Sequence, residues 1–435
     1  MKRILLSAIF LAASYLSALD LAESIQIALQ NNLQLKSQEE SLKAAQADEW
    51  SSYLGLGPSA SLGMNYNDSD ANFDGENFTN SLSLQVNQPL FNGGKIFLGA
   101  MINRDLQQIE AQNILVKRLE IIAETEKKYF AVLENEELVN IARQNLEAAE
   151  SNFQKGEVRF ESGSISKVEL LQLQSDLASK EVNLMQSQNS LAILKQDLQN
   201  YLQLDKLPQL QSIDFEQYAA LIEKLKNLKS IDPLFSQLLL LVEQQNPALQ
   251  ISALSKSTSK KGVWLAAGNF LPTLNLSYSK NWIDSDNPMS LQDYDSNQSI
   301  GLNISVPVFP LADNGLQLAK ANYQLRRSGY QAASTKDGIE LALRNAIYQM
   351  LSNAKLIESA RLAFQYAEES YQQMSERFDS GLITTNDLLA SRVMLASAQN
   401  QYTRAKYNFL KSQTAILQQL GTDDRKTLEK ILMGE

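Results

Sequence analysis

Four short segments of the chain alternate apolar and polar residues with a period of two. In each of them, leucine, isoleucine, methionine or tyrosine alternates with small or polar residues, which gives an extended chain one apolar and one polar face. Pro89 and Pro307 follow the second segment of each pair, and we expect these prolines to close the strands. The pattern predicts four β-strands, at residues 59–67, 81–87, 274–278 and 300–306.

These predicted strands fit two environments. Small polar residues on one face and aliphatic residues on the other suit a strand between lipid and water, and about ten residues cross a bilayer when the strand is tilted. A half-buried hairpin in a soluble sheet shows the same alternation. The strands by themselves leave both interpretations open.

Long helical segments surround the strands. Residues 20–57 and 236–270 are rich in helix-forming residues, and residues 92–161 and 313–379 contain no proline. A helix over the third of these segments would approach about 100 Å in length. A further helical segment follows each long one, with a seven-residue repeat of large side chains that predicts coiled-coil packing. The repeat consists of Leu170, Leu177, Leu184, Leu191 and Leu198 in the first half and Leu388, Leu395, Tyr402 and Phe409 in the second.

The two halves of the chain repeat one another. Trp50 aligns with Trp264, and the Arg-Phe-Glu-Ser-Gly motif at 159–163 aligns with Arg-Phe-Asp-Ser-Gly at 377–381. Because such anchors occur in the same order with little drift in spacing, the chain is interpreted as a tandem duplication. The predicted organisation is a signal peptide at 1–18, a first repeat at 19–203, a linker or equatorial segment at 204–235, a second repeat at 236–420 and a C-terminal tail at 421–435.

The N-terminus has the pattern of a secretory signal peptide. Lys2 and Arg3 precede an apolar run over residues 4–16, and the small residues Ser17 and Ala18 follow it. We expect cleavage after Ala18. The alternative, a membrane-anchoring helix, fits less well because the run is shorter than the ~18 residues that a spanning helix needs.

The composition excludes several classes of function. The chain has no cysteine and no histidine, so it lacks disulfides, thiolate catalysis and the commonest general base and transition-metal ligand. We therefore expect neither an enzyme nor a cofactor or metal site. The formal charge of −10, which removal of Lys2 and Arg3 makes more negative, argues against nucleic acid as a partner.

Four strands are too few to close a barrel, because about eight is the smallest number seen. An open sheet in lipid would leave the backbone groups of two edges without partners, at a cost of several kcal/mol each. The strands would therefore be shared between chains, two chains giving eight strands and three giving twelve. A lumen wide enough for cargo favours three chains.

Five motifs spread over nearly the whole mature chain carry a family resemblance. They are Gln-Pro-Leu-Phe-Asn-Gly-Gly at 88–94, Asn-Pro-Ala-Leu at 246–249, Leu-Pro-Thr-Leu-Asn-Leu at 271–276, Arg-Phe-Asp-Ser-Gly at 377–381 and Asp-Leu-Leu-Ala at 387–390. In these motifs the chain resembles the outer-membrane factor (TolC-like) family of efflux and type I secretion channels.

The resemblance implies a mixed α+β membrane protein with duplicated halves, located in the bacterial outer membrane and extending into the periplasm. Four β-strands per chain would contribute to a trimeric, twelve-stranded β-barrel above a long α-helical coiled-coil tunnel. The implied partners are two further copies of the chain, outer-membrane lipid, a periplasmic adaptor protein and an inner-membrane pump of the RND or ABC type.

The resemblance also assigns roles to the turns between the long helices. In the family, these turns form the periplasmic tip, where the tunnel narrows and the adaptor docks. Capping of a helix C-terminus by a left-handed glycine would explain the glycines of these turns equally well. The matching residues are Phe160, Ser162 and Gly163 in the first turn and Phe378, Ser380, Gly381 and Leu382 in the second.

Six residues beyond each of these glycines stands an acid, Glu169 or Asp387. The family's aspartate in the second half lines the constriction, so Asp387 of a trimer would form a ring of three carboxylates that attracts cations. Acids are also common in the first turn of a helix, and this simpler role remains open for both residues. Ile383 and Ala390 stand where some relatives carry a basic and a second acidic residue, so Lys167 becomes a candidate partner for an acid in the closed state.

Other classes of protein share some of these features. A periplasmic adaptor has long hairpin helices and β-structure, but it usually holds one hairpin in a chain that is not duplicated. A trimeric coiled-coil surface fibre would have its strands at the C-terminus rather than inside each half. Neither the cargo nor the class of pump follows from the sequence, because a passive duct accepts what the pump delivers.

Overall fold

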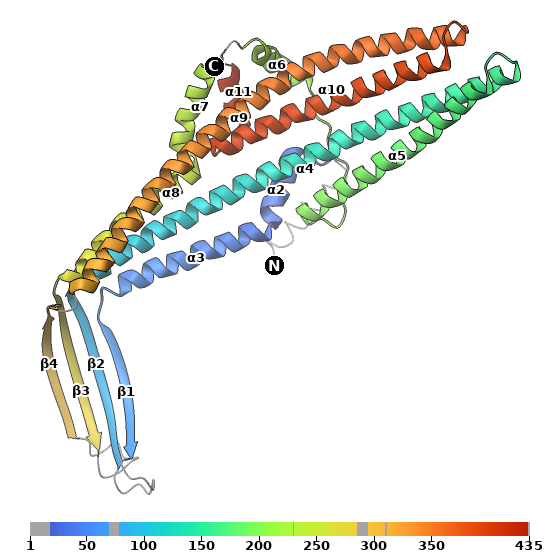
Figure 1. Cartoon of the computed structure of the whole chain (residues 1–435). Coiled ribbons are helices and arrows are strands. Elements are labelled where there is room, and N and C mark those ends of the chain that lie inside the picture. Colours follow the sequence, from blue (N-terminus) through green and yellow to red (C-terminus); the bar gives the residue numbers. More distant parts are fainter. Residues whose placement is uncertain (1–17, 69–77, 229, 285–294, 309–310, 434–435) are drawn as a thin grey trace, which may run out of the picture. The chain divides into compact units, whose positions relative to one another are not determined.

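The computed structural model describes residues 18–68, 78–228, 230–284, 295–308 and 311–433, so the predicted signal peptide lies outside the described residues except for Ala18. The first half contains α2 (Leu21–Asn31), α3 (Leu33–Leu54), β1 (Ser59–Asp68), β2 (Phe78–Asn92), α4 (Lys95–Glu161) and α5 (Lys167–Leu202) (Figure 1). The second half contains α7 (Asp232–Gln245), α8 (Pro247–Ala267), η3 (Gly268–Phe270), β3 (Thr273–Asp284), β4 (Asp295–Ser305), α9 (Leu311–Asp379) and α10 (Thr385–Leu420). The remaining elements are η2 (Glu216–Tyr218), α6 (Ala219–Lys226) and α11 (Arg425–Met433).

The same elements recur in the same order in both halves, which confirms the duplication. Helices α5 and α10 both have 36 residues, and the long helices α4 and α9 have 67 and 69 residues. The long proline-free segments therefore form single helices, as predicted. Among the helices of the described residues, none carries an apolar stretch long enough to cross a membrane.

The two shorter helical segments are each interrupted once. Asn32 separates α2 from α3, and its Oδ1 accepts hydrogen bonds from the backbone N–H groups of Gln34 and Leu35 at 2.9 and 3.0 Å. Asn32 therefore caps the N-terminus of α3. Asn246 separates α7 from α8 in an extended conformation, which is the preference of a residue that precedes proline. Each segment forms two helices rather than one.

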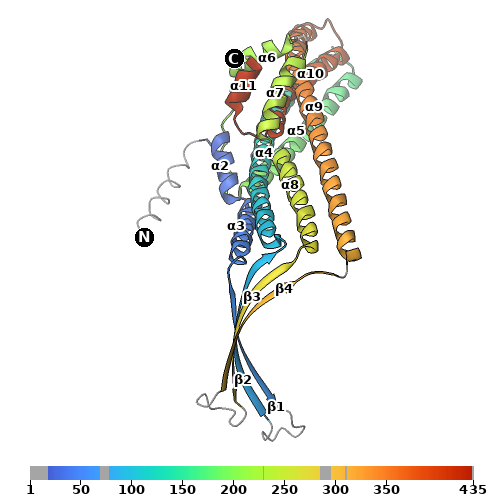
Figure 2. The same ribbon diagram turned by 90° about the vertical axis from the view of Figure 1, so that its left-hand side faces the viewer.

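The four strands form one antiparallel sheet in the order β1-β2-β3-β4, and Figure 2 shows its twist. The prediction that Pro89 closes the second strand is wrong, because β2 continues to Asn92. Pairing of β2 with β1 ends at Asn87, so at Pro89 the one neighbouring strand of β2 is β3. Pro89, which has no N–H group to donate, lies there beside a shift in register. Strand β4 ends before Pro307, as predicted.

Large apolar side chains of the two edge strands remain exposed. On β1, Leu62 and Met64 keep 69% and 66% of their accessible surface, and on β4 Ile300 and Ile304 keep 78% and 63%. A half-buried hairpin of a soluble protein would bury such a row against a core. The exposure favours lipid as the environment of this face.

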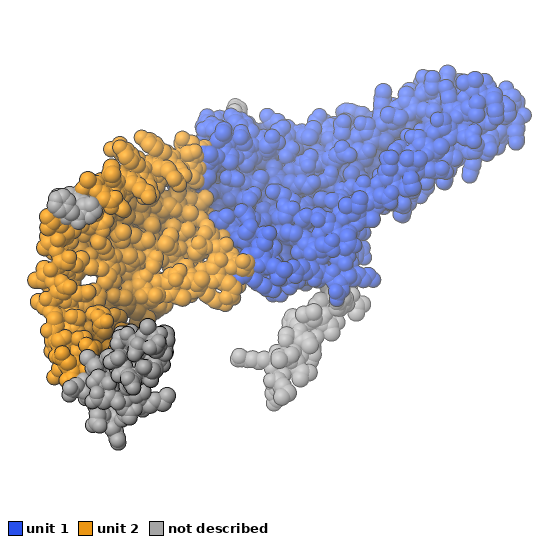
Figure 3. Space-filling model, turned by 60° about the horizontal axis from the view of Figure 1, so that its bottom comes forward, with its two compact units in different colours: residues 1–36, 115–246, 338–435 blue, residues 37–114, 247–337 orange. Residues whose placement is uncertain are grey.

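The chain divides into two compact units, and each unit draws on both repeats (Figure 3). Unit 1 comprises residues 1–36, 115–246 and 338–435, and unit 2 comprises residues 37–114 and 247–337. Unit 2 holds the sheet, α8, most of α3 and the adjoining ends of α4 and α9. Unit 1 holds the remaining helices, including both turns of the predicted tip.

Within unit 1, the segment between the repeats packs against the last long helix. Phe215 lies edge-on to Tyr407 with ring centroids 5.4 Å apart, and Tyr218 lies edge-on to Phe409 at 6.2 Å. The residues expected to form a tail include the short helix α11, which buries two leucines. The linker and the C-terminal residues are therefore parts of the unit 1 core.

Candidate gate and docking turns at the helix ends

Each predicted tip turn connects a long helix to the next one through a left-handed glycine. Gly163 has a φ of +74° and Gly381 a φ of +71°. In the first turn, the N–H of Ser164 donates to the carbonyl oxygen of Arg159 at 2.7 Å, and the second turn repeats this bond at 2.9 Å. Each glycine also donates to the carbonyl three residues back. This is the Schellman arrangement, which satisfies the last carbonyls of α4 and α9 and confirms the capping interpretation.

The two candidate gate acids occupy the third position of the following helices. The backbone N–H of Ser166 donates to Glu169 Oε2 at 2.8 Å, and the N–H of Glu169 donates to Ser166 Oγ at 3.2 Å. Thr384 and Asp387 exchange the same two bonds at 3.1 and 3.2 Å. These are capping boxes, so the role in the first turn of the helix is confirmed for both acids.

The capping bonds also favour the charged form of the two carboxylates. The backbone N–H of Ser166, followed by its hydroxyl, lowers the pKa of Glu169, and the hydroxyl of Thr384, followed by its N–H, lowers the pKa of Asp387. One oxygen of each carboxylate accepts these bonds, and the other accepts none within the described residues. Each acid can therefore cap its helix and still present negative charge to a passing ion.

The two turns of one chain line a common depression with a volume of about 580 Å³. Lys155 Nζ pairs with Asp379 at 2.8 Å, and the guanidinium of Arg159 lies 4.3 Å from the centre of the Phe378 ring. These contacts join the end of α4 to the end of α9. The lining includes both candidate gate acids and residues of both turns: Arg159, Ser164, Ile165, Glu169, Phe378, Asp379, Ser380, Gly381, Leu382, Ile383, Thr384 and Asp387.

The predicted docking residues fall into buried and exposed groups. Phe378 keeps 2% of its accessible surface, so it stabilises the tip from within. Phe160 is 38% exposed, and Lys167 Nζ lies 5.3 Å from its ring centre, so in this structure Lys167 contacts an aromatic ring. Leu382 is 71% exposed. The serines and glycines of both turns, Ser162, Gly163, Ser380 and Gly381, are also at the surface.

Sequence reasoning did not single out Arg159 or the ion pair between Lys155 and Asp379 as parts of the site. Arg159 opens the duplicated Arg-Phe motif, so the repeat itself was a signal that could have found it. The ion pair joins residues 224 positions apart. No local pattern reveals such a partner.

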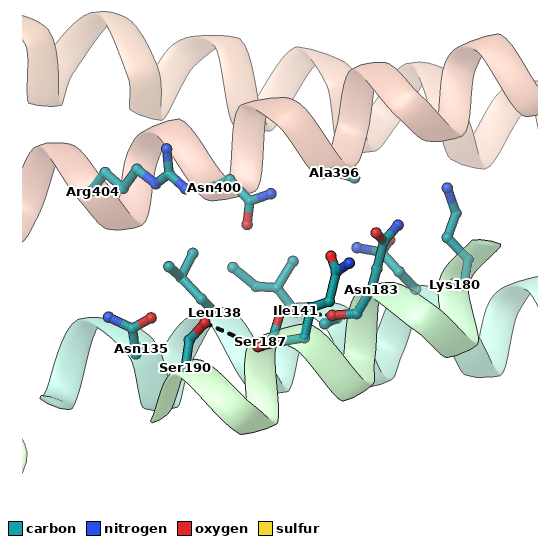
Figure 4. Close-up of a pocket in the computed structure, with 13 residues that line it drawn as sticks. Asn135, Leu138, Ile141, Lys180, Asn183, Ser187, Ser190, Ala396, Asn400 and Arg404 are labelled. Carbon is teal, nitrogen blue, oxygen red and sulfur yellow. Dashed lines mark hydrogen bonds between the residues drawn. The ribbon is translucent and has the colours of Figure 1, made fainter. Parts of the chain in front are cut away.

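A second depression, of about 460 Å³, lies in unit 1 between α4, α5 and α10 (Figure 4). Asn145 is 8% exposed there, and its Oδ1 has no hydrogen-bond partner in the described part of the chain. Such a lining suits water or small polar solutes. Its polar residues are Asn135, Asn145, Lys180, Asn183, Gln186, Ser187, Ser190, Asn400 and Arg404. No group of three or more acidic side chains anywhere in the described ranges is placed to hold a metal ion.

Known proteins share this architecture. The family described as outer membrane efflux protein matches residues 24–202 and 238–422. The outer membrane protein TolC of Escherichia coli is 25% identical over 453 residues, covering 98% of this chain and 88% of TolC. The alkaline protease secretion protein AprF of Pseudomonas aeruginosa is 24% identical over 369 residues, covering 82% of this chain and 72% of AprF. The crystal structure of CusC has the same fold, with a TM-score of 0.81, 15% identity and 94% coverage of each chain.

The family match spans both helical hairpins and all four strands. The predicted fold of long helices with four antiparallel strands in repeated halves is confirmed, as are the outer-membrane location and the role as an efflux or secretion channel. The periplasmic adaptor, the surface fibre and the enzyme are set aside, because this family consists of transport channels. The chain belongs to the outer membrane efflux protein family.

Proposed function

We propose that three copies of this chain form a passive exit duct through the bacterial outer membrane. The observation that carries the proposal is the sheet, in which β1 and β4 are edge strands with exposed apolar side chains. Each backbone group left unpaired in hydrocarbon costs several kcal/mol. Pairing β4 of one copy with β1 of the next removes every edge, and three copies supply a closed barrel of twelve strands.

The long helices would continue this barrel as a tunnel into the periplasm. A periplasmic adaptor would dock at the exposed part of the tip turns, at Leu382, Ser380, Gly381, Ser162 and Gly163, while Phe160 and Phe378 hold the turns in shape. An inner-membrane pump of the RND or ABC type would supply the cargo. A relative whose name describes protease secretion supports a polypeptide as one candidate cargo.

The gate of the duct would consist of Asp387, with Glu169 beside it. Three copies would place three Asp387 carboxylates around one axis, and the capping bonds that lower the pKa of each carboxyl favour its ionised form. A ring of this kind attracts cations and repels anions at the narrowest point. Ile383 and Ala390 supply neither a basic nor a second acidic group, so the charge of the constriction would come from these two acids.

We also propose that residues 1–18 are removed on export. Leu19 hydrogen-bonds to the segment between the repeats: its N–H donates to the carbonyl of Gln209 at 2.8 Å, and its carbonyl accepts from the N–H of Gln211 at 2.9 Å. Tyr129 Oη donates to the same Leu19 carbonyl at 2.9 Å. Cleavage after Ala18 would leave these contacts intact.

Planar-bilayer recording tests the duct directly. The purified mature chain in detergent is expected to insert as discrete channels that conduct potassium in preference to chloride. Heat-denatured protein from the same preparation serves as the control. A folded preparation that produces no conductance steps would overturn the proposal.

A further inference from the structure

We infer that Lys280 and Trp282 of β3, with Gln298 of β4, bind a phosphate group of the glycolipid that forms the outer leaflet of the outer membrane. The inference rests on the proposed duct, in which the apolar face of the sheet meets lipid. It adds a site for one headgroup to that face, at its outer boundary. The three residues lie together because Lys280 pairs with Gln298 across the strands and Trp282 follows two positions later on the same face of β3.

Lys280 interrupts the apolar face of the sheet. On β3, Leu274, Leu276 and Tyr278 precede it at alternate positions of this face. Its cross-strand partner on β2 is Leu84, and cross-strand partners share a face. A lysine on the lipid face is costly at the middle of a bilayer, and the cost falls steeply towards the interfaces. We therefore expect Lys280 at the level of the headgroups.

That level belongs to the outer side of the membrane. Strand β3 begins at Thr273, after the helical elements α8 and η3, and ends at Asp284 (Figure 1). The helices extend into the periplasm, so the Asp284 end of the strand faces the outside of the cell. Lys280 lies nearer to this end than to Thr273. The headgroups beside it are therefore those of the outer leaflet.

The height of the apolar band on the neighbouring edge strand agrees with this level. Exposed apolar side chains occupy every second position from Ile300 to Val308, and the exposed polar residues Ser296 and Gln298 come before them. Extended over residues 298–308 and tilted by about 40°, the chain rises by about 25 Å. The apolar band of an outer-membrane barrel has the same height, roughly 25 Å. Gln298 and Lys280 therefore mark its outer boundary.

The ammonium group of Lys280 lies beside a side chain that is typical of membrane interfaces. Its Nζ is 4.9 Å from the centre of the Trp282 ring, and Trp282 is closer than Lys280 to the outer end of β3. The aliphatic stem of a lysine can cover apolar surface while its charge leaves the hydrocarbon, and tryptophan favours the same level. No acidic group pairs with Lys280 among the side chains that the structure describes. The site therefore carries an unneutralised positive charge.

A phosphorylated sugar complements this site in charge and in shape. The Lys280 ammonium would form a charge-assisted hydrogen bond with a phosphate oxygen, and the exposed Gln298 amide would donate a second bond. Ser296, opposite Trp282 and also exposed, supplies a further hydroxyl donor. The indole of Trp282 offers a flat apolar surface against which a sugar ring can pack. A phosphorylated glycolipid such as lipid A carries both groups, whereas phosphatidylglycerol lacks the sugar.

Native mass spectrometry of the mature chain in detergent, with bisphosphorylated lipid A added, tests the site. The natural chain is expected to retain one lipid A molecule per chain. In Lys280→Gln, the affinity for lipid A should fall about fivefold, the contribution of one lysine near a membrane surface. The matched control is Lys95→Gln, which removes the same charge at the first residue of α4, at the periplasmic end of the sheet. We expect the control to retain lipid A as the natural chain does.

Two further variants separate recognition from folding. Lys280→Arg keeps the charge and should retain lipid A. Trp282→Leu keeps an apolar side chain on the lipid face and should lower the affinity, because it removes the surface against which the sugar packs. Retention of lipid A by both Lys280→Gln and Trp282→Leu at the level of the natural chain would overturn the site.

Other probes define the ligand. Lipid A without its phosphate groups should bind equally to the natural chain and to Lys280→Gln. Phosphatidylglycerol and inorganic phosphate, each at the concentration of lipid A, should not displace it. Displacement by phosphatidylglycerol would indicate a site for any phospholipid, and displacement by inorganic phosphate a site for a free anion. Either result would overturn the assignment to a glycolipid.

The outcomes also separate this site from the duct itself. A conducting assembly of three chains in which Lys280→Gln binds lipid A as tightly as the natural chain overturns the site and leaves the duct standing. A monomer that forms no channels overturns both. A Lys280→Gln variant that conducts like the natural chain and binds lipid A about fivefold more weakly supports both.

Discussion

At the scale of the residue, one carboxylate caps a helix and is also the proposed gate. Asp387 caps α10 through Oδ2 and leaves Oδ1 available to ions, and Glu169 does the same on α5. The serine or threonine three residues before each acid made the capping box readable from the sequence. The burial of Phe378 under Arg159 was not readable, because that contact joins two turns that are distant in the chain.

Replacing Asp387 with asparagine separates the two tasks. Asp387→Asn keeps a side-chain oxygen that can accept the capping bonds but removes three charges from the proposed ring. The potassium-to-chloride permeability ratio, measured from reversal potentials in planar bilayers, should fall severalfold with little change in thermal stability. Thr384→Ala is the matched control. It keeps the charge and the permeability ratio but loses a cap, at a cost of about 1 kcal/mol in the free energy of unfolding.

An unchanged permeability ratio in Asp387→Asn, with the same result in Glu169→Gln, would show that neither acid sets the selectivity. Their role would then be limited to capping. Because both substitutions are nearly isosteric and both side chains lie at a helix terminus, loss of the fold would not explain such a result.

At the scale of the element, most of the correct predictions of helices and turns rested on the positions of proline and glycine. The absence of proline correctly indicated α4 and α9 as single long helices, and glycines marked both tip turns. The extent of β2 past Pro89 could not be predicted, because it depends on which neighbouring strand ends first. The interruption at Asn32 was missed because a polar residue inside a helical segment gives no sign that its side chain will cap the next helix.

Substitution by alanine should lower the stability of the protein at a left-handed glycine and raise it at a glycine inside a helix. An added Cβ at Gly381 meets no atom within 4 Å, so Gly381→Ala suffers from the φ of +71° and not from a clash. It should destabilise the protein by about 1 kcal/mol. Gly338→Ala, inside α9 and also in open space, should stabilise it by up to about 1 kcal/mol.

Thermal or denaturant unfolding in detergent measures both variants. Equal shifts of the midpoint in the same direction would contradict the assignment of Gly381 as a left-handed cap. The pair is a sensitive comparison because both changes add the same methyl group to exposed positions of the same chain.

At the scale of the whole molecule, counting strands predicts an assembly of several copies. The strand count could not show which side chains join the two helical hairpins within unit 1. There, acids on α4 face cations on α10 and α11 in three ion pairs, Glu134–Lys411 at 2.6 Å, Glu137–Lys406 at 2.9 Å and Glu126–Arg425 at 2.7 Å. Their partners are more than 260 residues apart in sequence, so no local pattern indicates which helices meet.

The central claim is that the four strands of one chain are completed by other copies. Native mass spectrometry of the mature chain in detergent tests it most directly. We predict a single assembly with three times the mass of one chain, which falls apart only when the sheet unfolds. A stable monomer with an intact sheet would contradict the account, because its two strand edges would then need no partners.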